Sequence, residues 1–262
     1  MATLPTLILL HGSWHSNDTW ERLLPLLNSK GYKTVAPQVC FCGTPEPLTS
    51  IAPCISQIQA LIAAETSAGR DVVMVNHSFG GVVGSSAVNG FTTKNPAKLE
   101  GTKGKVIGII QMASLTVPTG SSLLEFLQKG KGSAIKPIGL AGPDGWDEMK
   151  RDVVEAMYHD LTPEDGAYWA SRILKHSSAT RSSSENVYAG WKDVPVCYLK
   201  CTDDRASDPG TQAKMIESIK EANEHVIVKE IFASHSPMLS KAAETAELVD
   251  EAAKWFTSLA SQ

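Results

Sequence analysis

Three short segments of the chain carry side chains that could act together in nucleophilic catalysis. The first is Asn76-His77-Ser78-Phe79-Gly80-Gly81, which follows the apolar run 71–75 and precedes a run of small and apolar residues. A serine on a sharp turn between a buried strand and a helix exposes its hydroxyl, because the strained turn points the side chain out of the sheet. The pattern predicts Ser78 as the nucleophile. Two positions before such a serine the usual residue is glycine, whereas this chain has Asn76. Small residues at such a junction can also serve packing alone.

The other two segments supply an acid and a base in the chain order that such a serine requires, which is Ser, then Asp or Glu, then His. A β-rich run, 194–201, leads to Asp203 and Asp204, and a second run, 225–232, leads to His235. Ligands bind outside the carboxyl ends of strands in open α/β sheets, so we expect these side chains at one edge. His235 would take the serine proton. An aspartate would orient the imidazole and stabilise the imidazolium.

Backbone donors for a developing oxyanion are predicted near the start of the chain. The apolar strand 6–10 is followed by His11-Gly12-Ser13-Trp14-His15. A His-Gly turn after the first core strand can present a backbone N–H toward the nucleophile. The N–H groups of Ser13 and Phe79 are therefore predicted to form the oxyanion hole, with His11 supporting the loop.

Strands and helices alternate along most of the chain, which implies βαβ units and a mostly parallel sheet. The predicted strands cover residues 6–10, 32–36, 71–76, 105–112, 194–201 and 225–232. The predicted helices cover residues 19–30, 50–68, 79–91, 209–223 and 238–259. The fold class is therefore α/β, with a central sheet flanked by helices.

Together these segments resemble the α/β-hydrolase superfamily from Leu7 to the C-terminal helix. The start His11-Gly12-Ser13-Trp14-His15 is similar to the small plant branch of methylesterases and hydroxynitrile lyases. Met112-Ala113-Ser114, Tyr158-His159-Asp160-Leu161 and Ser234-His235-Ser236-Pro237 are more similar to fungal relatives, many of which accompany secondary-metabolite pathways. The resemblance implies an α/β-hydrolase fold and a serine hydrolase that needs no cofactor.

The resemblance also orders the candidate acids. The family places its acid about five residues before a proline that opens the next helix, and the residue five before Pro209 is Asp204. Asp203 remains the alternative, and Asp208 lies in the same loop. The acids outside the triad are expected to be solvated or to cap a helix.

One segment breaks the alternation of strands and helices. Residues 116–190 contain no clear strand, several glycines, and helical stretches at 146–158 and 163–174. In the superfamily this insertion point holds a helical cap, and long excursions in compact domains are usually functional. We therefore expect a core of residues 1–115 and 191–262 and a cap of residues 116–190. The alternative is a surface excursion with local packing.

Substrate contacts are expected from the loops and from this cap. Trp14 and Leu115 adjoin residues that the mechanism places, and His15 could orient a ligand in a mostly apolar pocket. Trp146 and Tyr158 are the cap candidates, although aromatic residues at helical spacing more often serve packing. Aromatic walls would suit a small aromatic or polyketide-like substrate.

The predicted function is a serine hydrolase that cleaves a carboxylic ester or lactone through an acyl-enzyme. Two alternatives stay open. One is carbon–carbon cleavage on the same triad, of the retro-Claisen or hydroxynitrile lyase type. The lyase branch typically has a lysine after the catalytic histidine, and Ser236 stands there in this chain. The other is a ligand-binding receptor on a hydrolase fold, which turnover of an activated ester would distinguish from an enzyme.

Composition excludes several other classes of partner. The net charge of −4 comes with no basic stripe, so nothing indicates nucleic acid, and no apolar run reaches the length of a membrane span. The start lacks a basic n-region, so we expect a cytoplasmic protein with five reduced cysteines. Cysteine spacing predicts no metal site. The partner is a small-molecule substrate, and the oligomeric state stays open, with a homodimer as one option.

Overall fold

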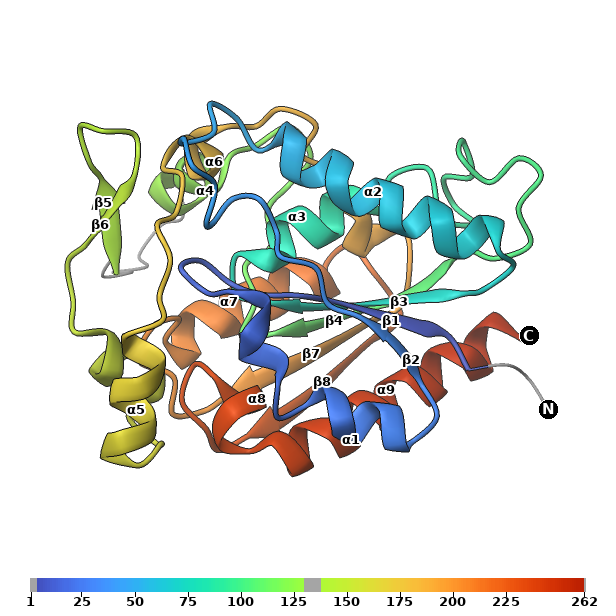
Figure 1. Cartoon of the computed structure of the whole chain (residues 1–262). Helices are drawn as coiled ribbons and strands as arrows, with labels where there is room; N and C mark the ends of the chain where they lie inside the picture. Colours follow the sequence, from blue (N-terminus) through green and yellow to red (C-terminus); the bar gives the residue numbers. More distant parts are fainter. Residues whose placement is uncertain (1–3, 130–137, 262) are drawn as a thin grey trace.

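The computed structural model describes residues 4–129 and 138–261. Its centre is a six-stranded sheet in the order β2-β1-β3-β4-β7-β8, in which every neighbouring pair is parallel (Figure 1). The strands are β1 Thr6–Leu10, β2 Lys33–Val35, β3 Val72–His77, β4 Val106–Met112, β7 Val196–Cys201 and β8 Val226–Ile231. The α/β fold class with a mostly parallel sheet, predicted from the alternation of elements, is confirmed.

The central strands are apolar at nearly every position because both faces of the sheet are covered. Side chains alternate between the two faces along a strand. In β1, for example, Leu7 and Leu9 belong to one buried cluster, while Ile8 and Leu10 belong to the other.

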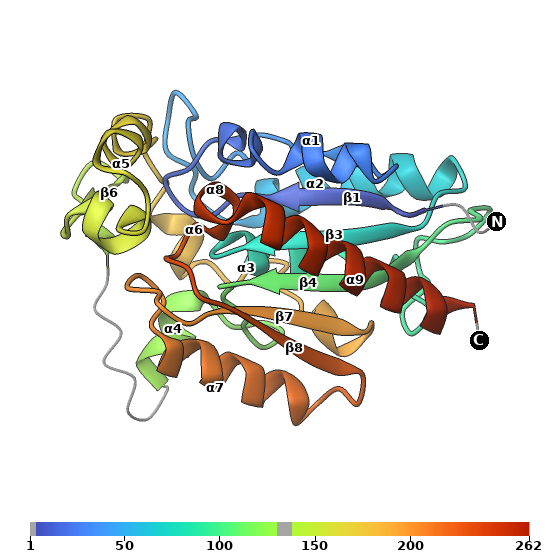
Figure 2. The ribbon, with the colours of Figure 1, turned by 90° about the horizontal axis from the view of Figure 1, so that it is seen from below.

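Helices form one layer on each face of the sheet (Figures 1 and 2). One layer contains α2 Ala52–Ser67, α3 Gly80–Ala87 and α7 Pro209–Lys220. The other contains α1 Leu24–Ser29, the short α8 Pro237–Ser240 and α9 Ala242–Ala260. The expected helix 238–259 is thus divided at Lys241, whose φ of −131° is not helical. The expected helix 19–30 is likewise divided into a 3₁₀ turn, Asn17–Trp20, and α1.

Most of the chain between β4 and β7 lies beyond the carboxyl ends of the strands (Figure 2), and its last part returns along α3 to the start of β7. Residues 130–137 of this expected cap lie outside the described residues. The described elements between β4 and β7 are α4 Leu123–Lys129, β5 Gly139–Ala141, β6 Asp147–Met149, a π-helical turn Val154–Tyr158, α5 Pro163–Ala170, α6 Ala179–Ser182 and a 3₁₀ turn Gly190–Lys192.

The prediction of a helix over 146–158, in a segment without strands, is wrong. β5 and β6 pair as an antiparallel hairpin. Its turn contains Gly145 at φ +83°, in the left-handed region, and Asp144 Oδ1 accepts the Trp146 N–H at 3.2 Å. This turn chemistry favours a hairpin over a helix, so the helical hydrogen bonding is confined to Val154–Tyr158.

The packing of α9 on β4 can be tested by a substitution at the contact between them. A Cβ added to Gly108 would lie 2.3 Å from the ring of Phe256, which is fully buried. We expect Gly108→Ala to lower the free energy of unfolding by about 1–3 kcal/mol, measured by urea denaturation. The double variant Gly108→Ala/Phe256→Leu makes room for the methyl group, so its loss should be smaller than the sum of the single losses. Strictly additive losses would contradict the direct contact.

Candidate active site

Ser78 lies on a strained turn between β3 and α3. Its φ is +51°, a left-handed conformation that few residues other than glycine adopt. The turn brings α3 against the end of β1, where a Cβ on Gly80 would lie 2.7 Å from the Leu10 carbonyl oxygen and 2.6 Å from that of His11. Gly80 is therefore required for the approach of the helix, and this approach holds Ser78 at the carboxyl edge of the sheet.

Position 76 is an ordinary strand position in this protein. Asn76 pairs in register with Leu10 on β1 and Gln111 on β4, and its φ is not positive. Its buried side chain lies against α3, where a Cβ on Gly84 would approach Asn76 Oδ1 to 2.0 Å. Asparagine thus fits because Gly84 leaves room on the helix, and not because asparagine tolerates a left-handed backbone.

Asp204 and His235 are buried and contact each other directly. His235 Nδ1 lies 2.7 Å from Asp204 Oδ2. The other carboxylate oxygen, Oδ1, accepts the backbone N–H groups of Ala206 at 2.7 Å and Ser207 at 2.9 Å. An ionised carboxylate can only accept, so His235 Nδ1 donates, which leaves Nε2 of a neutral ring able to accept a proton.

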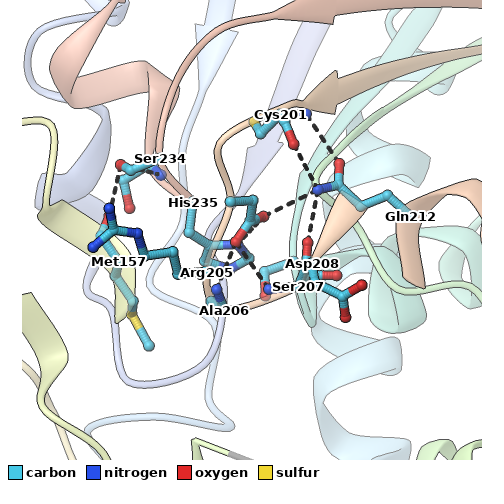
Figure 3. A network of polar contacts seen from close by, with 12 residues as sticks. Met157, Cys201, Arg205, Ala206, Ser207, Asp208, Gln212, Ser234 and His235 are labelled. Carbon is cyan, nitrogen blue, oxygen red and sulfur yellow. Dashed lines mark hydrogen bonds and ion pairs between the residues drawn. The ribbon is translucent and has the colours of Figure 1, made fainter. Parts of the chain in front are cut away.

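Gln212 on α7 holds the loop that carries this acid, as Figure 3 shows. Its amide exchanges two hydrogen bonds with the Cys201 backbone, at 3.0 and 2.9 Å. Gln212 Nε2 also donates to the Ser207 carbonyl at 2.7 Å and lies 3.3 Å from Asp204 Oδ2. Sequence reasoning missed Gln212, because nothing in the sequence around this glutamine indicates that it turns back toward the end of β7.

The three acids of this loop have different partners. Asp203 is partly exposed, and its carboxylate lies 3.1 Å from His159 Nε2. Asp208 Oδ1 caps α7 by accepting the Gly210 N–H at 3.0 Å. Of the three, Asp204 alone contacts His235 within the described residues.

The N–H of Phe79 is directed by the carbonyl of the same peptide group. In a trans peptide the N–H points opposite to the carbonyl oxygen. The Ser78 carbonyl oxygen accepts three hydrogen bonds, each at 3.0 Å, from the N–H groups of Gly81 and Leu115 and from Ser114 Oγ. These donors fix the peptide plane. The Phe79 N–H points away from these donors, on the opposite side of the peptide group, and has no acceptor among the described residues.

The N–H of Ser13 is directed in the same way. The Gly12 carbonyl oxygen accepts from His11 Nδ1 at 2.9 Å and from the His15 N–H at 3.4 Å. Throughout the parts of the chain that the structure covers, the Ser13 N–H also lacks an acceptor. Both N–H groups expected to form the oxyanion hole are thus oriented by hydrogen-bonded carbonyls and have no acceptor in the described ranges.

Two buried, neutral histidines hold the loop that follows β1. His11 Nε2 accepts the Val39 N–H at 2.9 Å, so its other nitrogen donates to Gly12. His15 Nδ1 donates to the Ser13 carbonyl, and its Nε2 accepts from the Tyr158 hydroxyl, both at 2.8 Å. Burial lowers the pKa of His11 to about 4 and that of His15 to about 3. These rings therefore hold backbone carbonyls in place and carry no charge.

His77 is also a structural group in this arrangement. Its Nε2 donates to the backbone carbonyl of His235 at 2.8 Å, and its ring is fully buried. Burial lowers its pKa well below the ordinary value. His77 therefore positions the backbone of His235 while Ser78, the next residue, faces the other way into the cavity.

A cavity of about 410 Å³ opens beside Ser78 and His235. Trp14 and Leu115 line it, as does Ser13. The apolar part of the wall otherwise comes from α4, β5 and the neighbouring loops. Its residues are Leu123, Leu124, Leu127, Ile138, Gly139, Leu140, Ala141 and Ala206. The polar remainder is Gln128, Arg181, Ser207 and Thr211.

Three expected substrate contacts lie outside the described lining of this cavity. His15 and Tyr158 hydrogen-bond to each other, so their polar atoms are already used. Trp146 is buried beside the turn of the hairpin and forms a β-bridge with Ser177. The lining residues from α4, β5 and α6 were missed, because apolar residues in a segment of unknown path carry no sign of the cavity they face.

Metal-binding clusters and membrane-spanning helices are both absent from residues 4–129 and 138–261. No three histidine, cysteine, aspartate or glutamate side chains gather there in a group that could hold a metal ion. No helix in those ranges has the length and apolar character needed to cross a bilayer.

The sequence matches known proteins along most of its length. The profile of the alpha/beta hydrolase family matches residues 7–248. Alpha/beta hydrolase nvfD of Aspergillus novofumigatus is 26% identical over 249 residues, which cover 95% of this chain and 96% of that protein. Methylesterase 2 of Arabidopsis thaliana is 25% identical over 252 residues, which cover 89% of this chain and 90% of that protein.

Solved structures share the fold. A pyrethroid hydrolase from Sphingobium faniae JZ-2 superposes with a TM-score of 0.76 at 20% identity, covering 96% of this chain and 98% of that one. Polyneuridine aldehyde esterase superposes with a TM-score of 0.69 at 21% identity, covering 94% and 99% of the two chains. At these identities the likeness establishes the architecture alone.

The neutral histidines predict a pH dependence of stability. His11 and His15 have folded pKa values of about 4 and 3, below the ordinary 6.5. Between those limits the unfolded chain binds more protons, so their contribution is complete above pH 6.5 and is lost as the pH falls. We expect the free energy of unfolding to drop by about 1.4 kcal/mol per pH unit for each such histidine, measured by urea denaturation between pH 6.5 and 4.5.

One variant assigns this slope to a particular residue. His15→Gln keeps a polar group for Tyr158 and should reduce the slope by about one proton. An unaltered slope in His15→Gln would mean that His15 is already protonated in the folded protein.

Proposed function

Because the chain belongs to the alpha/beta hydrolase family, we propose that it is a serine hydrolase that cleaves a carboxylic ester or lactone of a small molecule. The observation that carries the proposal is that Ser78 and His235 line one cavity, while Asp204 is hydrogen-bonded to Nδ1 of His235. The name of one relative, a methylesterase, favours ester substrates.

In the proposed acylation step, Ser78 Oγ attacks the ester carbonyl while His235 Nε2 accepts the serine proton. Asp204 stabilises the imidazolium that forms. The negative charge on the tetrahedral intermediate is held by the N–H groups of Ser13 and Phe79, which need no reorganisation because their peptide planes are already fixed. His235 then protonates the leaving alkoxide, and an acyl-enzyme remains.

Deacylation reverses these roles with water as the nucleophile. His235 Nε2 takes a proton from a water molecule, and the resulting hydroxide attacks the acyl carbonyl. The same two N–H groups hold the second oxyanion, and the proton on His235 returns to Ser78 Oγ as the carboxylic acid leaves. Every proton in the cycle is carried by His235, so no cofactor is required.

Substrate choice is proposed to come from residues 116–190 acting as a cap on a core of residues 1–115 and 191–262. Support comes from the cavity wall, where α4, β5 and α6 supply most of the side chains that do not belong to the catalytic loops. These side chains are largely aliphatic, which favours a substrate with an apolar body.

A cytoplasmic location is part of the proposal. Its support is that all five cysteines are free thiols, as is usual in a reducing compartment.

Ser78 is expected to react covalently with an active-site-directed fluorophosphonate. One adduct should form, and mass spectrometry should locate it on the peptide that contains Ser78. Ser78→Ala should lose several orders of magnitude in kcat on p-nitrophenyl acetate, because the members of a triad act as one unit. Labelling of another serine, or activity retained by Ser78→Ala, would refute the proposed nucleophile.

Two neighbouring aspartates provide a matched pair of variants. Asp204→Asn should reduce kcat by about 10⁴-fold while the protein stays folded, because an amide no longer stabilises the imidazolium. Asp203→Asn, which alters only the contact with His159, should change kcat much less. Steady-state kinetics with circular dichroism of both variants measures this. A larger loss in Asp203→Asn would reverse the assignment of the acid.

A further inference from the structure

The cavity wall contains a buried cation that the proposed catalytic steps do not use. Arg181, on α6, lines the cavity and is 8% exposed. Its Nη2 lies 2.7 Å from Asp147 Oδ1 on β6, and its Nη1 donates to the Gly139 carbonyl on β5 at 3.1 Å. The guanidinium therefore joins α6 to both strands of the hairpin that forms part of the wall.

Arg181 retains unused hydrogen-bonding capacity. A guanidinium has five N–H donors, and two of them have acceptors among the described residues. Its Nε is buried and has no acceptor there. Because fewer than half of the five donors are used within the described residues, the guanidinium can donate further hydrogen bonds to an acceptor in the cavity that Arg181 lines.

The charges around the cavity also favour an anion on this wall. The side chain of Asp147 is fully buried and does not belong to the described lining, so the cation lies nearer to the cavity than its counter-ion. No aspartate or glutamate occurs among the described lining residues. Ser207 also belongs to the lining, and its buried hydroxyl has no hydrogen-bond partner among the residues that the structure describes.

The rest of the wall limits what the anion can be attached to. The leucines of α4, together with Ile138 and Leu140, present aliphatic surface. A ligand that matches both parts has an apolar chain or ring and one anionic oxygen group. A carboxylate fits best, because its two oxygens match the planar fork of a guanidinium.

We propose that Arg181 determines specificity by binding a carboxylate on the substrate, so that the preferred substrate is an apolar ester that also carries a free carboxylic acid. This inference rests on the proposed function, since it assigns the substrate class of the same site. Arg181 would keep its bond to Asp147 and use its remaining N–H groups for the ligand.

The kinetic test compares two substrates that differ only in charge. One is the mono-p-nitrophenyl ester of suberic acid, and the other is the same ester with its free carboxyl replaced by a primary amide. We expect wild-type kcat/KM to be roughly tenfold or more higher for the acid, the size expected for a hydrogen bond to a charged group. Equal kcat/KM values for the two esters would overturn the inference.

Paired variants separate recognition from bracing of the hairpin. Arg181→Gln/Asp147→Asn removes both charges without leaving a buried carboxylate unpaired, and it should bring the acid-to-amide ratio close to one. Asp147→Asn alone keeps the cation and should preserve the preference for the acid. A preference that survives in the double variant would show that Arg181 only braces the hairpin.

A binding experiment makes the inference independent of catalysis. Calorimetry on Ser78→Ala should show octanoate binding more tightly than octanamide, because this variant leaves Arg181 intact. If wild-type protein hydrolyses neither ester while octanoate is preferred, the proposed hydrolysis fails and the carboxylate site stands. If ester hydrolysis depends on Ser78 but octanoate and octanamide bind equally, the site fails and the hydrolase stands.

Discussion

The close approach of α3 to the sheet is the constraint on which the rest of the site depends. Gly80 faces the carbonyl oxygens at the end of β1, and a Cβ on Gly81 would lie 1.9 Å from Ser114 Oγ. With glycine at both positions, Ser78 can occupy a left-handed turn, and its carbonyl oxygen can accept three hydrogen bonds. The same contact thus sets the exposure of the serine hydroxyl and the direction of the Phe79 N–H. Strain at a catalytic position is sustained because the surrounding backbone over-determines it.

Buried polar groups hold the remaining loops without adding charge. His11 and His15 stay neutral because burial disfavours the imidazolium, and a neutral ring can donate through one nitrogen while it accepts through the other. Each ring therefore links two elements, His11 joining Val39 to Gly12 and His15 joining Tyr158 to Ser13. Through Tyr158, the segment between β4 and β7 is bonded to the loop that presents the Ser13 N–H. Packing of that segment and geometry of the site are coupled by hydrogen bonds.

The cavity wall follows a different physical rule. Aliphatic side chains of α4 and β5 form its apolar surface. The ion pair between Arg181 and Asp147 ties the hairpin to α6. Burial raises the pKa of the Asp147 carboxyl, and the guanidinium opposes that rise. A buried pair of this kind contributes little net stability compared with apolar residues. Its presence at a cavity is therefore better explained by recognition than by stability.

Local patterns in the sequence were enough to predict the parallel sheet, the strained turn at Ser78 and the place of His235 after a strand, whereas the choice of Asp204 over Asp203 came from the family resemblance. Apolar runs specify buried strands, and small residues specify where a helix can approach them. The hairpin at 139–149 depends on turn chemistry at Asp144 and Gly145, which the sequence prediction of a helix overlooked. The residues that line the cavity were decided by the tertiary structure, because distant segments meet there. Which side chains face a shared cavity depends on the path of each segment in space, and periodicity along the chain carries no information about that path.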